Sequence, residues 1–178
     1  EIKGSLLMVD IIKQAIRAWQ TVLAEPVTIR VDGTPFAVTP QMTRRARGRA
    51  RASRRPHNRA RQIFHDKLVE EIVNAYAAEI GTDPTQPDRP GLLLSASDYA
   101  DLTEDLLNSP EVQALVEDNW PILTAPQVVE RLLTDRRHLE EASHTILSDD
   151  DVDYLLRAKD SPFTAVSYPH LRAHETVL

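Results

Sequence analysis

The sequence contains no cysteine, little aromatic material and no long hydrophobic run. The lack of cysteine excludes disulfides, thiolate metal sites and a cysteine nucleophile. Aromatic residues make up only 5% of the 178 residues, which leaves little for a platform that stacks bases. No stretch approaches the roughly 20 apolar residues of a membrane-spanning helix, and the N-terminus lacks a signal-peptide pattern. We therefore expect a cytoplasmic protein.

Glycine is also scarce, with five residues in the whole chain. None of them belongs to a GxGxxG, GxxxxGKS or GxxxxGKT arrangement, so a nucleotide site cannot be completed within this sequence. No GxSxG motif marks a nucleophilic serine. The sequence therefore predicts no catalytic residue, no bound cofactor and no metal site of its own.

The charge that is present is distributed very unevenly, although the formal net charge is only -6. Residues 41–62 hold nine arginines and no acid, so the rest of the chain has 12 basic against 27 acidic residues. Seven of these arginines are the candidate contact residues for nucleic acid or a protein partner: Arg44, Arg45, Arg47, Arg49, Arg51, Arg54 and Arg55.

On a helix, Arg44, Arg47 and Arg51, with Arg54 or Arg55, would form one ridge able to neutralise several phosphates. The block has no aromatic residue, which argues against stacking on single-stranded bases. A solvated face that meets the acidic remainder of the same chain is the alternative interpretation.

A second charged group consists of four aspartates, Asp149, Asp150, Asp151 and Asp153. Carboxylates can bind a hard cation, but the alternating spacing and the glycine of an EF-hand loop are missing. Ser148 precedes the group as a good N-cap, and carboxylates are favoured in the first turn of a helix. A charged helix N-terminus therefore explains most of the cluster.

Hydrophobic periodicity predicts a mainly helical fold with one small β-hairpin. A helix is expected from Ile2 to Leu23, then a hairpin over about 27–38 with Asp32-Gly33 as its turn. Thr39-Pro40 is expected to start the arginine-rich helix, which Pro56 stops. The further helices are expected over about 58–80 with Gly81 as C-cap, from Ser95 or Ser97 to 108, from Ser109-Pro110 to 120, over about 124–139, and from Ser148 onward.

Four segments follow from this pattern. Residues 1–81 carry the long helices and the hairpin, residues 82–91 form a proline-rich linker, and residues 92–165 carry the shorter helices. The last segment, residues 166–178, does not look like natural protein sequence. One translated frame of a common sequencing adapter reads VSYTHLRAHET, and residues 166–176, VSYPHLRAHET, match it at all positions except Pro169. We expect this tail to be adapter-derived, so the helical zinc-ligand spacing of His170 and His174 carries no weight.

Residues 1–165 resemble a segment of the HelD-type helicase-like ATPases, which are superfamily I relatives of UvrD and Rep helicases. The stretches that carry the resemblance are IKGSLLMVDIIKQAI, VTIRVDGTPFAVTP, RRPHNRARQIF, NWPILTAPQVVERLL and RAKDSPFT. The resemblance implies a helical insertion region of the first motor lobe, between a Walker A motif upstream of Glu1 and a Walker B strand after SPFT.

The resemblance further implies a parent protein that uses ATP and Mg, binds RNA polymerase and releases it from DNA. It implies that the insertion opens the DNA clamp and that Asp149, Asp150, Asp151 and Asp153 are candidates for an acidic arm. The chain itself would be a partner-contacting insertion without ATPase motifs. The alternatives are a stand-alone arginine-rich module that binds nucleic acid, and a helical scaffold with a solvated basic face.

Overall fold

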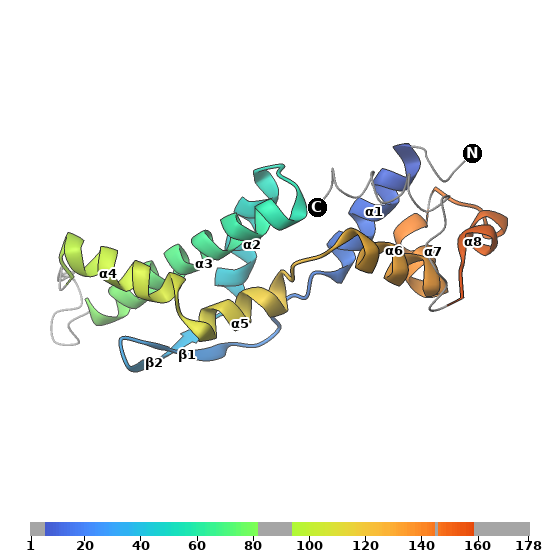
Figure 1. Ribbon diagram of the computed structural model, residues 1–178. Helices are drawn as coiled ribbons and strands as arrows, with labels where there is room; N and C mark the ends of the chain where they lie inside the picture. Colours follow the sequence, from blue (N-terminus) through green and yellow to red (C-terminus); the bar gives the residue numbers. More distant parts are fainter. Residues whose placement is uncertain (1–5, 82–93, 145, 159–178) are drawn as a thin grey trace. The chain divides into compact units, whose positions relative to one another are not determined.

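The computed structural model describes residues 6–81, 94–144 and 146–158, and within them the chain forms eight helices and one antiparallel hairpin (Figure 1). The predicted linker 82–91 and the predicted tail 166–178, with His170 and His174, lie outside the described residues. In the described part of the chain, none of the helices combines the length and apolar character needed to cross a membrane.

The chain divides into two compact units. The hairpin unit comprises the described residues of 21–55 and 60–121, and the terminal unit comprises those of 1–20, 56–59 and 122–178. Each unit has its own apolar core.

The hairpin unit is built on two strands and four helices. Strand β1 (Val27–Val31) pairs with β2 (Thr34–Val38) in the register Val31 to Thr34, which confirms the predicted hairpin. Its helices are α2 (Pro40–Ala52), α3 (His57–Ile80, from Ala60 onward in this unit), α4 (Ala96–Leu107) and α5 (Pro110–Asn119). The arginine-rich helix therefore forms as predicted, although it ends at Ala52, four residues before Pro56.

The core of the hairpin unit explains why this short hairpin is stable. A two-stranded hairpin is marginal in water unless one of its faces is covered. Ile29 and Val31 from β1 and Phe36 and Val38 from β2 are buried in the same apolar cluster as residues of α3. Within this cluster the rings of Phe64 and Trp120 stack with their centroids 5.5 Å apart.

The terminal unit contains α1 (Leu6–Trp19), α6 (Ala125–Thr134), α7 (Arg136–Ser143) and α8 (Asp149–Leu155). Its core is formed by the apolar stripes of these helices, which include Ile11, Ile12, Val128, Leu132 and Leu139. Helix α1 ends at Trp19, so the predicted continuation to Leu23 is wrong. Beyond the end of the helix, Gln20 Nε2 lies 3.4 Å from His57 Nδ1, and the Thr21 carbonyl accepts a hydrogen bond from Arg47.

The single helix predicted over 124–139 is also wrong, because Asp135 divides it into α6 and α7. Asp135 has extended backbone angles, φ −122° and ψ 110°, and its carboxylate accepts a hydrogen bond from the His138 amide at 3.3 Å. An aspartate competes for backbone donors in this way, which favours a helix N-cap over a helix interior. The other predicted starts are confirmed, with Thr39, Ser95, Ser109 and Ser148 as N-caps.

Candidate nucleic-acid interface on helix α2

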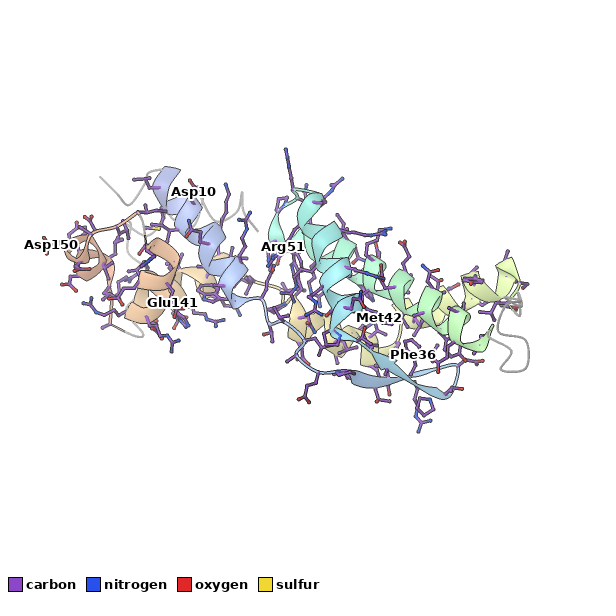
Figure 2. The ribbon with its side chains drawn as sticks, turned by 180° about the vertical axis from the view of Figure 1, so that it is seen from behind. Asp10, Phe36, Met42, Arg51, Glu141 and Asp150 are labelled. Atoms are coloured by element: carbon purple, nitrogen blue, oxygen red, sulfur yellow. The ribbon has the colours of Figure 1, made fainter. Side chains whose placement is uncertain are left out.

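The side chains of helix α2 lie on three sides of the helix, one buried and two exposed. The buried side is made of small residues and one arginine, namely Thr43, Ala46, Ala50 and Arg47. At 100° per residue, Arg45 and Arg49 lie on a second side, and Arg44 and Arg51 lie on a third side with Gly48 between them. Figure 2 labels Met42 and Arg51 toward opposite ends of this helix.

Arg47 belongs to the interior of the hairpin unit and not to its surface. Its side chain is buried, and its Nη2 donates hydrogen bonds to the carbonyl oxygens of Thr21 and Asn119, the latter at 3.3 Å. Burial, followed by repulsion from Arg51, lowers the pKa of the Arg47 guanidinium. The expected ridge through Arg44, Arg47 and Arg51 is therefore wrong at its middle position.

The two last candidates, Arg54 and Arg55, lie beyond the end of α2. Ser53 caps the helix, and Arg54 has a φ of 54°, in the left-handed region. Both side chains are exposed. Because the chain has left the helix before them, neither residue extends the ridge of α2.

Arg45 and Arg49 form what we call the guarded row, because acidic residues of α3 pair with both. Arg45 Nη1 lies 3.3 Å from Glu71 Oε2, and Arg49 Nη1 lies 3.2 Å from Glu70 Oε1. Glu70 also accepts a hydrogen bond from Lys67, which is the main reason why the pKa of its carboxyl is lowered, with Arg49 contributing less. The guarded row is thus largely neutralised by its own chain.

Arg44 and Arg51 form what we call the open row, a name that refers only to the exposure of both side chains to solvent. They are separated by seven residues, or about 10 Å along the helix axis. Gly48 lies between them on the same side, and a Cβ placed on it would meet nothing within 4 Å. The helix backbone in the centre of the open row is therefore accessible to a large partner.

The acidic cluster has two kinds of members. Asp151 forms a capping box with Ser148, and this hydrogen bonding lowers the pKa of its carboxyl. Asp153 pairs with Arg136. Asp149 and Asp150 are exposed in the first turn of α8. Helix capping and an ion pair account for Asp151 and Asp153, whereas a role of the four aspartates as an acidic arm stays a prediction.

The hairpin unit also contains a pocket of about 260 Å³, which sequence reasoning did not predict. Its described lining combines apolar and acidic residues, namely Tyr76, Ile80, Leu94, Leu102, Asp32, Asp98, Asp101 and Asp105. The spacing of Asp98, Asp101 and Asp105 along one side of a helix is the signal that could have indicated its acidic wall. Within the described ranges no group of three or more histidine or acidic side chains is arranged to hold a metal ion.

Comparison with known proteins adds no assignment: no protein-family model matches the chain, and neither does any curated protein. The geometry of α2 is therefore the main observation on which a function can be proposed.

Proposed function

We propose that the open row of α2, Arg44 and Arg51, binds the phosphate backbone of double-stranded DNA. In this proposal the chain is the helical insertion region of a HelD-type helicase-like ATPase. The parent protein would use ATP and Mg and would release RNA polymerase from nucleic acid. The chain itself would supply a contact surface and no catalytic group.

The observation that carries the proposal is the exposure of Arg44 and Arg51 on either side of Gly48. Arginine is well suited to phosphate because its planar guanidinium can donate two parallel hydrogen bonds. Both residues lie in a stretch without any acid, whereas the remainder of the chain is strongly acidic. A polyanion is therefore attracted to this helix and repelled by most of the other surface.

Duplex DNA suits this surface better than a single strand. Proteins that hold single strands combine basic grooves with aromatic side chains that stack on the bases. Helix α2 has the sequence PQMTRRARGRARA and contains no aromatic residue. Contacts to phosphates alone position a protein on a duplex without reading its sequence. We therefore expect binding that depends on salt and tolerates any duplex sequence.

The test uses a fluorescein-labelled 20-base-pair duplex of mixed sequence and fluorescence anisotropy. We expect the 178-residue chain to bind it, and the affinity to fall at least tenfold as salt rises from 50 to 200 mM. A single-stranded oligonucleotide of equal length should bind no more tightly than the duplex. The proposal would be contradicted if the chain did not bind the duplex at low salt, or if its affinity did not depend on salt. If the chain bound only acidic protein, the partner of α2 would be a protein and not DNA.

The HelD-type assignment has a separate test, because it concerns the parent gene. We expect long-read sequencing of the source locus to find a Walker A loop upstream of Glu1. Downstream of Thr164 we expect a strand ending in Asp-Glu-Ala in place of residues 166–178. If the locus encodes residues 166–178 as printed, followed by a stop codon, the adapter interpretation is wrong. The stand-alone arginine-rich module then becomes the better proposal.

A further inference from the structure

We infer that the pocket of the hairpin unit binds a linear polyamine such as spermidine, an aliphatic chain that carries several ammonium groups. The pocket is lined by residues of the hairpin turn, the last turns of α3 and the helix α4. Its described lining includes no residue of α2, so this inference goes beyond the proposed duplex contact and does not depend on it.

The charge of the pocket is of one sign. Asp32 comes from the hairpin turn, and Asp98, Asp101 and Asp105 come from one side of α4, so the carboxylates belong to two separate elements. The described lining contains no basic residue. In the described ranges of the chain, the carboxylates of Asp32, Asp101 and Asp105 have no ion pair or hydrogen bond. A cleft lined by one sign of charge concentrates ligands of the opposite sign.

A buried tyrosine adds an independent observation that indicates a ligand. Tyr76 is only 7% exposed, and its ring packs against Phe36 with the ring centroids 5.9 Å apart. Tyr76 also lines the pocket, and its hydroxyl has no hydrogen-bond partner within the part of the chain that the structure describes. Buried polar groups normally have a partner, and a phenolic oxygen can accept a hydrogen bond from an ammonium group. The hydroxyl therefore suits a ligand with N–H donors.

An extended organic cation fits this lining better than a metal ion does. Over the described residues, no three acidic or histidine side chains are grouped so that they could hold one metal ion. A polyamine spreads its charge along a chain, so its ammonium groups can reach separate carboxylates. The lining also includes Ile80 and Leu102, whose apolar side chains can contact the methylene groups of the ligand.

The size of the pocket and the spacing of its acids agree with a small cation. The volume of about 260 Å³ is just below the roughly 300–1,000 Å³ of sites for drug-sized molecules. Asp101 and Asp105 are four residues apart on α4, and like charges at this spacing destabilise a helix. A bound cation offsets this repulsion in the folded state, so the ligand should stabilise the chain against unfolding.

The test is isothermal titration calorimetry of spermidine into the 178-residue chain at low salt. Nucleic acid is left out, because polyamines also bind the phosphates of DNA. We expect one spermidine to bind each chain and to raise the midpoint of thermal unfolding. Asp101→Asn with Asp105→Asn should weaken binding at least tenfold, since it removes two partners of the ammonium groups. No binding of spermidine, or unchanged affinity in this variant, would overturn the inference.

A matched control separates the pocket from the general charge of the hairpin unit. Asp66→Asn with Asp118→Asn removes the same charge from two exposed residues outside the described lining, and it should change the affinity less than twofold. An equal loss in both double variants would show that spermidine binds the acidic surface in general, contrary to the inference.

A third variant tests the tyrosine. Tyr76→Phe removes only the hydroxyl, and it should weaken spermidine binding about threefold. The unfolding midpoint of the free chain should not fall, because this hydroxyl has no partner to lose among the described residues. Unchanged affinity of the Tyr76→Phe chain would contradict binding inside the pocket, even if the aspartate variant did not fold.

Two further probes test the class of ligand. Butylamine carries one ammonium group on a short aliphatic chain, like the end of a lysine side chain, and Mg²⁺ is a compact dication. Each should bind at least tenfold more weakly than spermidine. Equal affinity for butylamine would assign the pocket to a single ammonium group, and equal affinity for Mg²⁺ would assign it to metal ions, so either result excludes the polyamine. None of these measurements involves the duplex, so their outcome is distinct from that of the proposed function.

Discussion

Arg47 of α2 donates a hydrogen bond to the main-chain carbonyl of Asn119, 3.3 Å away and 72 residues along the chain. The same guanidinium nitrogen donates to the carbonyl of Thr21. One arginine of the basic block thus connects three segments of the hairpin unit from the inside. Arg47 therefore stabilises the fold, whereas Arg44, Arg45, Arg49 and Arg51 on the other sides of α2 are exposed to solvent.

The first prediction concerns this difference. Arg47→Met replaces the guanidinium with an apolar side chain of similar length, and it leaves two carbonyl oxygens without their donor. This substitution should lower the free energy of unfolding by about 2 kcal/mol. Arg44→Met removes an exposed charge and should change it by less than about 0.5 kcal/mol. Urea denaturation measures both variants. Equal stability of the two would show that the buried contacts of Arg47 contribute nothing.

The second prediction compares two glycines with opposite backbone requirements. Gly33 in the hairpin turn has a φ of 74°, so Gly33→Ala should destabilise the chain by about 1 kcal/mol. Gly48 lies in a helix with open space around its Cβ position, so Gly48→Ala should stabilise it by up to about 1 kcal/mol. Thermal unfolding followed by circular dichroism measures both effects. Shifts of the same sign would contradict the assigned backbone conformations.

The third prediction concerns acid sensitivity of α8. Hydrogen bonds from the Ser148 side chain and then its main-chain amide lower the pKa of the Asp151 carboxyl. Because folding favours the ionised form, this contribution to stability is present above the ordinary aspartate pKa of about 3.9 and is lost as the pH falls through the lowered value. Ser148→Ala should move the pKa of Asp151 back up, as measured by NMR titration of its carboxyl carbon. An unchanged pKa would exclude the capping box as the cause.

The capping residues and the hairpin were predictable because their signals are local. Ser95, Ser109 and Ser148 each precede a helix that they cap, and Asp32-Gly33 forms the expected turn. A few neighbouring residues are sufficient to define such features.

The errors arose where distant parts of the chain decide the outcome. Periodicity alone gave no reason to bury Arg47, because its acceptors are 26 and 72 residues away. The pairing of the guarded row with Glu70 and Glu71 depends in the same way on how α2 and α3 meet. At Asp135 the capping signal was local, because this residue ends α6 and caps α7. The apolar periodicity continues through Asp135, so it predicted one helix in place of two.

The central claim, that the open row of α2 holds a DNA duplex by its phosphates, is tested most directly by the salt dependence of one double variant. Arg44→Met with Arg51→Met should weaken duplex binding at least tenfold at 50 mM salt and reduce the log–log salt slope by about 1.8, which is about 0.9 for each lost contact. The control, Arg17→Met with Arg137→Met, removes two exposed charges from the terminal unit and should leave the slope unchanged. Equal slopes for the two variants would contradict the account.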